Sequence, residues 1–449
     1  MELGLTLRSA LAACLLVIAS ASARSNVLSS LTPLSGIKYK LVKANLPPNP
    51  DKVTQNYQAI QAHRGSGTNS RSAAAVLGEH QRQLNGGGGG YENITSTTAY
   101  GTQYAIQLMF HETPVSLILD TGSSDTWVVQ DGFRCLDYTG QIVEQASCGF
   151  GPAQPTDFQY GSIPQEHLYI QYGDGETVSG QMGYNDITVG NITVKKQQVG
   201  LANTTYWRGN NMTSGLVGLA YPTLTNAYIG NASDHGWGNQ VLYSPLFTTM
   251  VSDGLIPPYF SVAINRNSSD GLLGWGGIPP VTGLDLSTSV ALDIVITNLI
   301  NNPITAWEHS FYTIIPDGFK WGSTTDVSKF PFIIDTGTTL MYLPPPLAAA
   351  INAAFRPSAI YLWMYGAYFT ACDAQAPPFA VILDGLSFYI NPVDLIYQGM
   401  VDPVTGLCMT AIASGGAGPY ILGDVFLQNV LAVFDVGNGQ MRFISRQFY

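Results

Sequence analysis

The sequence predicts an all-β protein that divides into two halves. Charged residues make up only 11% of the 449 residues, while the chain holds 48 Gly, 26 Pro and 24 Tyr. This composition favours many short strands and turns over long charged helices. A hydrophobic fraction of 45% is sufficient for well-packed globular lobes. One apolar segment ending in Asp-Thr-Gly occurs twice, about two hundred residues apart, which assigns one motif to each half.

Residues 1–23 have the pattern of a secretory signal peptide. Arg8 precedes an apolar run at residues 11–18, and the small residues that follow provide an A-x-A-like cleavage site near Ala23. The run is too short to cross a bilayer, no later segment reaches that length, and the C-terminal residues lack the tail of a lipid-anchor signal. We therefore expect a secreted protein without a membrane anchor. A vacuolar destination remains the alternative, because both routes begin with the same signal.

The distribution of charge separates a basic leader from an acidic body. Residues 24–90 hold eight Lys and Arg against two Asp and Glu, whereas residues 91–449 hold ten against twenty-seven. A run of glycines at residues 86–90 marks the boundary, because it favours neither strand nor helix and is accessible to a protease. We interpret residues 24–90 as a removable propeptide. The acidic body argues against a nucleic-acid partner, since it would repel phosphates.

The charge of the propeptide offers a reason for latency. Lys38, Lys40, Lys43 and Lys52 are suited to cover an acidic surface. When the pH falls and the carboxylates of that surface become protonated, the attachment weakens. The precursor would then be an acid-triggered zymogen. The alternative is a flexible basic leader with no inhibitory role.

Candidate modification and cross-linking sites lie in the body. Four cysteines remain once Cys14 leaves with the signal peptide, and they allow three pairings in an oxidising compartment. Their spacing favours Cys135 with Cys148 and Cys372 with Cys408. No C-x-x-C pair or His cluster indicates a metal site. Candidate N-glycosylation sequons occur at Asn93, Asn191, Asn203, Asn211, Asn231 and Asn267.

Two aspartates follow closely similar apolar segments. Residues 117–124 read Leu-Ile-Leu-Asp-Thr-Gly-Ser-Ser, and residues 332–339 read Phe-Ile-Ile-Asp-Thr-Gly-Thr-Thr. In each segment the apolar run predicts a buried strand, and the glycine permits the sharp turn at which the aspartate emerges. If the two loops meet about a pseudo-twofold axis, Asp120 and Asp335 lie too close together to ionise at once, and the pair shares one proton.

Such a pair has the chemistry to hydrolyse a peptide bond without a covalent intermediate. The ionised carboxylate takes a proton from a water between the two groups, while the protonated carboxyl polarises the substrate carbonyl. The threonine after each aspartate is expected to reach across to the opposite loop, and the hydroxyl residue two positions further on is expected to hydrogen-bond the outer carboxylate oxygen. The supporting residues are Thr121, Gly122, Ser123, Thr336, Gly337 and Thr338.

On these residues the sequence resembles the pepsin family of aspartic peptidases, including its fungal members. The resemblance extends from about Tyr104 to the C-terminus, and Trp127 follows the first motif at the family's spacing. It implies a bilobal pepsin-like fold with the active-site cleft between two β-rich lobes, at residues 91–280 and 281–449. It also implies an aspartic endopeptidase that acts at acidic pH and prefers hydrophobic residues at the scissile bond.

Residues 170–175, Ile-Gln-Tyr-Gly-Asp-Gly, are similar to the family's flap, a hairpin that closes over bound substrate. The resemblance makes Tyr172 the flap tyrosine, bonded to Trp127, with Gly173 and Asp174 beside it. Alone, a Tyr-Gly-Asp-Gly segment is more often an ordinary hairpin turn.

Further positions match the family in both halves. Ile118, Tyr172 and Leu216 match positions that form an apolar pocket for the substrate residue before the scissile bond. Residues 216–218 and 421–423 resemble the strands that thread beneath each aspartate loop.

The flap also departs from many relatives, because it carries the acids Asp174 and Glu176. In some fungal-type relatives an aspartate at the flap accepts a substrate lysine before the scissile bond, so cleavage after lysine is a hypothesis here. The alternative is a solvated acidic turn. The pair His111-Glu112 is a weak hint of a zinc peptidase, but position 115 is Val115 rather than a second His.

The resemblance implies protein or peptide substrates, pepstatin-type inhibitors and a monomeric enzyme with no cofactor, no metal and no nucleic-acid partner. The main alternative is a binding or storage protein with the same fold but no activity, since folds of this kind can lose chemistry and keep their shape. The presence of both aspartates, both following threonines and the flap tyrosine favours the enzyme.

Overall fold

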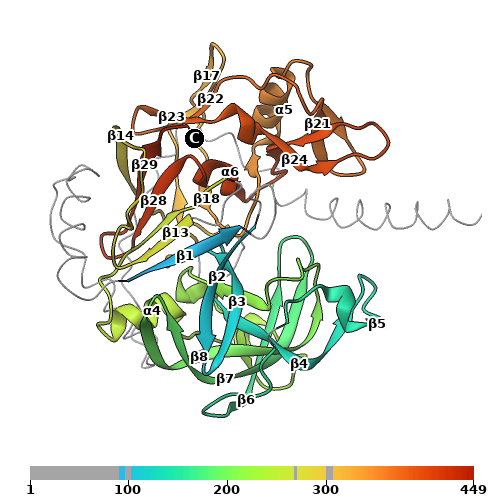
Figure 1. The fold of residues 1–449 in the computed structure, drawn as a ribbon, viewed down its shortest axis with the longest axis vertical. Helices are drawn as coiled ribbons and strands as arrows, with labels where there is room; N and C mark the ends of the chain where they lie inside the picture. Colours follow the sequence, from blue (N-terminus) through green and yellow to red (C-terminus); the bar gives the residue numbers. More distant parts are fainter. Residues whose placement is uncertain (1–89, 97–102, 153, 267–270, 300–306, 449) are drawn as a thin grey trace, which may run out of the picture.

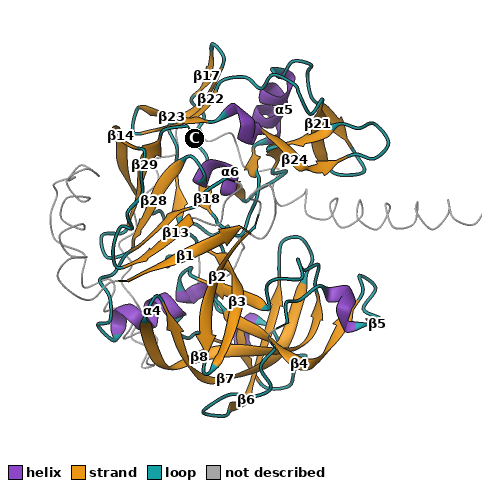
Figure 2. Ribbon diagram, viewed as in Figure 1, coloured by secondary structure: helices purple, strands orange, loops and turns teal. Residues whose placement is uncertain are grey.

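The structure is a computed structural model that describes residues 90–96, 103–152, 154–266, 271–299 and 307–448. The predicted signal peptide, nearly all of the predicted propeptide and the sequon at Asn267 lie outside the described residues. Strands dominate the described part, with a few short helices between them, as Figure 2 shows. The all-β prediction is therefore confirmed.

The elements of the first half are mostly strands. They are β1 (Gly90–Ser96), β2 (Tyr104–Phe110), β3 (Thr113–Asp120), β4 (Thr126–Leu136), β5 (Ile142–Val143), β6 (Ser162–Gln171), β7 (Thr177–Val189), β8 (Ile192–Tyr206), β9 (Gly215–Gly218), β10 (Ala227–Ile229), β11 (Gln240–Val241), the helix α4 (Leu246–Ser252), β12 (Phe260–Ala263) and β13 (Gly271–Trp275). Short 3-10 turns lie at η1 (Gln145–Cys148), η2 (Pro222–Leu224) and η3 (Trp237–Asn239).

The second half continues in the same manner. Its elements are β14 (Leu284–Asp293), β15 (Thr313–Ile314), β16 (Gly318–Trp321), β17 (Thr324–Asp326), β18 (Phe332–Ile334), β19 (Met341–Leu343), α5 (Pro345–Ala353), β20 (Ile360–Leu362), β21 (Ala367–Thr370), β22 (Phe379–Leu383), β23 (Leu386–Ile390), η4 (Pro392–Leu395), β24 (Ile396–Val401), β25 (Cys408–Thr410), β26 (Ile412–Ser414), β27 (Tyr420–Leu422), α6 (Asp424–Leu427), β28 (Val430–Asp435) and β29 (Gln440–Arg446).

One extended sheet runs through most of the molecule, in the order β11-β10-β6-β7-β8-β4-β9-β3-β2-β1-β13-β12-β28-β29-β14. In Figure 1, β2 to β8 lie in the lower lobe, and β1, β13 and β28 lie between the lobes. β1 joins the two parts because it pairs antiparallel with both β2 and β13. The fold is thus bilobal, with strands shared between the lobes.

Beside β14, β28 and β29 of the extended sheet, the upper part of Figure 1 contains strands of three smaller sheets. One has five strands, β15-β18-β27-β19-β26, and the others have four each, β17-β16-β22-β23 and β20-β21-β25-β24. β12 and β13 precede residue 280, yet β12 pairs with β28 near the end of the chain. Strands from both sides of residue 280 therefore belong to one sheet, and the division of the lobes at that residue stays a prediction.

Aromatic side chains fill the core between the lobes. The ring of Phe260 stacks on that of Phe434 with centroids 4.4 Å apart, and Tyr312 meets Phe434 edge-on at 4.7 Å. These rings come from segments far apart in the sequence and are all buried. Burial of a side chain of this size contributes about 1.5–3 kcal/mol, so this cluster helps to hold the two halves together.

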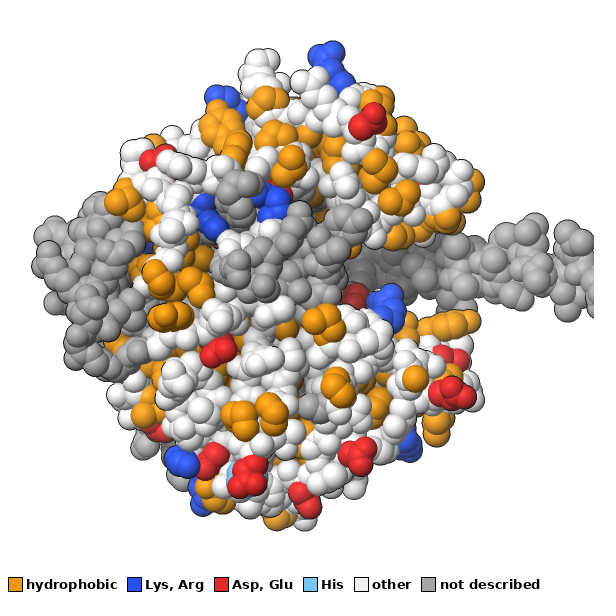
Figure 3. All heavy atoms as spheres, in the orientation of Figure 1, with side chains coloured by type: hydrophobic (Ala, Val, Ile, Leu, Met, Phe, Trp, Pro, Cys, Tyr) orange, Lys and Arg blue, Asp and Glu red, His pale blue; other side chains and the backbone are white. Residues whose placement is uncertain are grey.

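The surface in Figure 3 carries scattered acidic and basic side chains among many uncharged ones, in keeping with the low charged content of the sequence. Within the part of the chain that the structure describes, no helix is both long enough and apolar enough to cross a membrane.

Candidate active site

The two predicted aspartates lie at the ends of buried strands, as their apolar frames predict. β3 ends at Asp120, and Asp335 directly follows β18. The strand residues before each aspartate are buried, and the two aspartates themselves are only 6% and 8% exposed. Burial separates both carboxyl groups from the water that would stabilise their charged forms.

A second strand threads beneath each aspartate loop. β9 runs parallel to β3, with Asp120 opposite Gly218, and β27 runs parallel to β18 in the same way. A side chain at Gly218 would strike the backbone of Ser123 and Ser124, and one at Gly423 would strike the carbonyl of Thr338 at 2.1 Å. Glycine is required at both positions because the strand passes so close to the loop.

The two loops are tied together by reciprocal hydrogen bonds through Thr121 and Thr336. The backbone N–H of each threonine donates to the hydroxyl of the other, at 3.0 Å in both directions. Each hydroxyl in turn donates to a carbonyl of the opposite strand, Thr121 to Ile334 at 3.0 Å and Thr336 to Leu119 at 2.8 Å. These buried bonds fix the distance between the loops, as the sequence predicts.

Each carboxylate is also oriented within its own loop. The N–H of Gly122 donates to Asp120 Oδ1 at 2.7 Å, and Ser123 Oγ donates to Oδ2. In the second loop Gly337 N–H donates to Asp335 Oδ1 at 2.8 Å, and Thr338 Oγ1 donates to Oδ2 at 2.6 Å. The outer oxygens are therefore bound to hydroxyl groups, which confirms the predicted geometry for Ser123 and Thr338.

The two carboxyl groups face each other across the loops. A Cβ added to Gly122 would lie 2.6 Å from Asp335 Oδ1, and one added to Gly337 would lie 2.6 Å from Asp120 Oδ1. Burial, and then the negative charge of Asp335, raise the pKa of Asp120 well above its usual range. The pair therefore tends to keep one proton, because two buried charges so close would repel each other.

The β6–β7 hairpin carries the predicted flap residues. Tyr172 lies at the turn, and its hydroxyl accepts a hydrogen bond from Trp127 Nε1 at 2.8 Å, as the resemblance implies. Gly173 and Asp174 follow in the exposed part of the turn. Burial, and next the charge of Asp120, raise the pKa of Tyr172 well above its usual range, so the hairpin turn lies near the aspartate pair.

An apolar cluster lies under this hairpin. Ile118, Trp127 and Leu216 are buried in it, and Tyr172 packs against it. The structure thus brings together the three residues that we assign to a substrate pocket.

A further buried carboxyl, Asp424, lies near the pair and is not predicted by the sequence. It opens α6 and is 1% exposed, and no described residue hydrogen-bonds either of its carboxyl oxygens. Burial and the charges of Asp335 and Asp120 raise its pKa well above the usual range. The sequence identifies the strand before it, but burial and proximity to the pair depend on the tertiary fold.

Both favoured disulfide pairings are present. Cys135 is bonded to Cys148, and Cys372 to Cys408. The first closes the turn between β4 and η1, and the second joins the segment after β21 to β25.

The described sequons differ in accessibility. Asn93, Asn191, Asn211 and Asn231 are exposed, whereas Asn203 in β8 is half-buried. Among the residues described, no group of three or more His, Cys, Asp or Glu side chains is arranged to hold a metal ion.

A bilobal β fold with two opposed, buried carboxyls on matching loops defines the class of aspartic-type peptidases. The family described as eukaryotic aspartyl protease matches residues 103–445. The chain belongs to this family and is an aspartic-type endopeptidase, a hydrolase.

Named relatives agree with this assignment. A probable aspartic-type endopeptidase of Aspergillus fumigatus is 38% identical over 411 residues, covering 89% of each chain. Rhizopuspepsin of Rhizopus chinensis is 28% identical over 327 residues, covering 72% of each chain. The crystal structure of an aspartic proteinase from Irpex lacteus has a similar fold, with a TM-score of 0.58 at 21% identity, covering 80% of this chain and 98% of that one.

Proposed function

We propose that Asp120 and Asp335 are the catalytic residues of an endopeptidase that acts at acidic pH on protein or peptide substrates. The observation that carries this proposal is the reciprocal pair of hydrogen bonds between Thr121 and Thr336, at 3.0 Å in each direction. These bonds hold two buried carboxyls face to face, which is the arrangement required to bind one water between them.

Catalysis begins with a water bound between the two carboxyls. The ionised carboxylate removes a proton from this water as its oxygen attacks the carbonyl carbon of the peptide bond. The protonated carboxyl gives its proton to the carbonyl oxygen, which produces a tetrahedral diol. One hydroxyl of the diol then returns a proton to the carboxylate, the other carboxyl protonates the amide nitrogen, and the C–N bond breaks to leave a carboxylic acid and an amine.

The pH range follows from the shared proton. Above the upper macroscopic pKa of the pair, both carboxyls are ionised and no group remains to protonate the carbonyl oxygen. Burial and the charge of Asp335 raise the pKa of Asp120, so this limit lies above the ordinary range of a carboxyl group. Activity is therefore expected in acid and is lost as the pH rises.

The preferred substrate has a large hydrophobic residue before the scissile bond. The apolar cluster of Ile118 and Leu216, with Tyr172 packed on it, supports this preference. Acceptance of lysine depends on Asp174, whose carboxylate lies 3.4 Å from Arg208 Nη2. Because Arg208 already neutralises this acid, we expect peptides with Phe before the scissile bond to be cleaved faster than matched peptides with Lys. Equal rates for the two would oppose this ranking.

The protein is proposed to reach its destination as a glycosylated zymogen. The predicted signal peptide at residues 1–23, the basic segment at residues 24–90 and the sequons support a secreted enzyme that is activated in acid, with the vacuole as the alternative destination. We expect this enzyme to be a monomer. The N-terminus of the protein recovered from culture medium and from vacuoles, compared with that of the acid-treated precursor, tests the destination and the cleavage point.

The activity is tested by incubating the purified precursor with a denatured protein at acidic and neutral pH, with and without pepstatin. Cleavage that requires acid and is blocked by pepstatin supports the proposal. An absence of cleavage by correctly processed protein would favour an inactive binding protein of the same fold.

A further inference from the structure

The turn of the β6–β7 hairpin is attached to a residue outside the hairpin. Arg208 donates its backbone N–H to Glu176 Oε1 at 2.6 Å, and its guanidinium Nε lies 3.6 Å from the same oxygen. Arg208 Nη2 also lies 3.4 Å from Asp174 Oδ2 and 3.3 Å from the Asp174 carbonyl oxygen, to which it donates. One arginine therefore binds both acids of the turn.

The turn itself is closed by few bonds. Tyr172 N–H donates to the Glu176 carbonyl at 2.9 Å, and Gly175 N–H donates to the Tyr172 carbonyl at 3.1 Å. Gly173, Asp174 and Gly175 are exposed, so little packing holds them. A contact that fixes Glu176 and Asp174 consequently fixes the backbone that follows Tyr172 in the turn.

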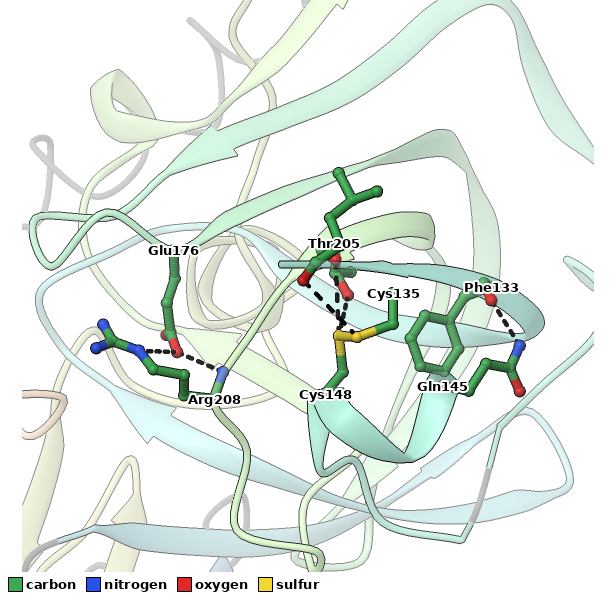
Figure 4. Close-up of a disulfide and its surroundings, with 8 residues drawn as sticks. Phe133, Cys135, Gln145, Cys148, Glu176, Thr205 and Arg208 are labelled. Atoms are coloured by element: carbon green, nitrogen blue, oxygen red, sulfur yellow. Dashed lines mark hydrogen bonds and ion pairs between the residues drawn. A yellow bond between two sulfur atoms is a disulfide. The ribbon is translucent and has the colours of Figure 1, made fainter. Parts of the chain in front are cut away.

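The segment that carries Arg208 is docked on the first disulfide, as Figure 4 shows for Cys148, Thr205 and Arg208. Gly209 N–H donates to the Cys148 carbonyl at 2.9 Å, and Cys148 Sγ lies 3.4 Å from Thr205 Oγ1. A Cβ on Gly209 would lie 2.2 Å from the Gly149 carbonyl oxygen, so the two backbones are in close contact. The disulfide therefore anchors the backbone segment that carries Arg208.

The residue before Arg208 adds an aromatic contact to the flap. The ring of Trp207 meets that of Tyr172 at 5.6 Å and that of Trp127 at 5.2 Å, both edge-on. It also stacks on Phe150, which follows the disulfide turn, at 5.9 Å. The same short segment therefore contacts the flap through a ring and through a charge.

We propose that Arg208, supported by the Cys135–Cys148 disulfide, is a positioning residue that holds the β6–β7 hairpin and its Tyr172 in place through Glu176 and Asp174. Its effect on catalysis rests on the proposed function, but its effect on the hairpin does not. Arg208 acts through the hairpin and has no assigned contact with substrate.

The hold on the hairpin changes with pH because Glu176 titrates. Burial, and next the charge of Asp174, raise the pKa of Glu176 to about 7, while Arg208 lowers it. The charged groups that face Glu176 are Asp174 from the turn and Arg208 from the segment after β8. The charge of Glu176 also acts on the nearby Tyr172. Because the closed turn raises this pKa, ionisation of Glu176 above about pH 7 weakens the hold on the turn. The contact of Arg208 Nη2 with the Asp174 carbonyl oxygen involves no carboxyl group.

The first experiment measures hydrogen exchange at the amides of Tyr172 and Gly175, which close the turn, at pH 4.5 and pH 7.5. Arg208→Gln is expected to raise the opening of the turn by about two- to fivefold at both pH values, the range of a partly exposed ion pair. Glu176→Gln is expected to lower the opening at pH 7.5 and to leave it unchanged at pH 4.5, because Gln keeps the neutral form that the closed turn favours. Arg208→Lys, which keeps the charge, is expected to restore part of the hold.

Arg134→Gln provides the matched control. Arg134 is an exposed arginine whose guanidinium donates to Thr204 at 2.9 Å. Thr204 belongs to β8, the strand that precedes Arg208, and not to the hairpin turn. This variant is expected to leave exchange at Tyr172 and Gly175 unchanged. Equal exchange in Arg208→Gln and Arg134→Gln would overturn the proposal, whether or not the protein cleaves peptides.

Two further measurements connect the hairpin to catalysis and to the disulfide. With a peptide substrate at pH 4.5, Arg208→Gln is expected to lower kcat/KM by about two- to fivefold while leaving the unfolding temperature near that of Arg134→Gln. In a Cys135→Ala/Cys148→Ala variant, the amides of Gly209 and Gly175 are both expected to exchange faster. Faster exchange at Gly209 alone would remove the disulfide from the proposal.

Discussion

The two aspartate loops share one backbone frame but place a second acid differently. In each half a strand threads beside the loop, β9 next to β3 and β4 and β27 next to β18 and β19. Five residues after the aspartate, the first half has Asp125 and the second has Leu340. After the threading glycine, the first half has Leu219 and the second has Asp424.

The environments of these two acids are opposite. Asp125 accepts hydrogen bonds from the Asn226 backbone at 2.9 Å, the Asn226 side chain at 2.8 Å and Tyr243 Oη at 2.6 Å. Asp424 has no such donor among the described residues. The fold therefore repeats, in both halves, the hydrogen bonds that orient the carboxyl pair. The additional acid is hydrogen-bonded in the first half, whereas in the second half it has no hydrogen-bond donor among the described residues.

The largest expected effect comes from replacing the glycine that follows the Asp-Thr pair in either aspartate loop. Gly122→Ala and Gly337→Ala each place a Cβ about 2.6 Å from the opposite aspartate, so the carboxyls must move apart. A misplacement of this kind is expected to lower kcat/KM by about a hundredfold or more in both variants. Steady-state kinetics on one peptide at acidic pH measure this.

Gly236→Ala serves as the control for those two variants. A Cβ at Gly236 would meet nothing within 4 Å, and no strained conformation is required there. It should retain wild-type activity. Near-normal activity in Gly122→Ala or Gly337→Ala would contradict the close approach of the carboxyls.

Equal effects are expected when either crossing threonine is changed. Thr121→Val leaves the Thr336 N–H and the Ile334 carbonyl without a partner, and Thr336→Val does the same to Thr121 and Leu119. Each variant should lower the free energy of unfolding by about 2–3 kcal/mol, because two buried polar groups are stranded. Denaturant unfolding measures this, and a clear inequality between the variants would mean that the two loops are not equivalent.

Opposite effects are expected for the two second acids. Asp125→Ala strands the donors of Asn226 and Tyr243 and should destabilise the protein by about 1–3 kcal/mol. Burial raises the pKa of Asp424, so this carboxyl ionises more readily in the unfolded chain than in the folded protein. Asp424→Asn removes that difference and should raise the unfolding temperature at pH 7 more than at pH 4. A loss of stability at pH 7 in Asp424→Asn would indicate that this carboxyl has a donor.

A smaller and broader effect is expected on stability against pH. Burial raises the pKa of Glu166 and of Glu176 from 4.5 to about 7, so the folded protein binds more protons than the unfolded chain between these values. Stability contributed by these groups is present in acid and declines as the pH rises through about 4.5 to 7. The unfolding temperature should fall over this window, and a rise would contradict the assigned shifts.

The sequence predicts the repeated part of the site because that part is encoded locally. An apolar strand, an aspartate, a glycine and a hydroxyl residue within eight positions determine the loops around Asp120 and Asp335, and the duplication indicates that they meet. Of the three pairings that four cysteines allow, spacing also favours the one observed.

Other contacts cannot be predicted in this way, because their partners are brought together only by the tertiary fold. Arg208 binds acids about thirty residues earlier in the chain, and nothing around Asp424 in the sequence indicates that it is buried beside the pair. The sharing of β1 between the lobes is likewise decided by packing rather than by local pattern.

The most direct test of the account is a side-by-side measurement of Asp120→Asn and Asp335→Asn on one peptide substrate at acidic pH, with the fold of each variant checked by circular dichroism. If the two halves contribute one carboxyl each to a single catalytic pair, both variants fold and both lose activity by about 10⁴-fold or more. Activity within tenfold of the wild type in either folded variant would contradict the central claim.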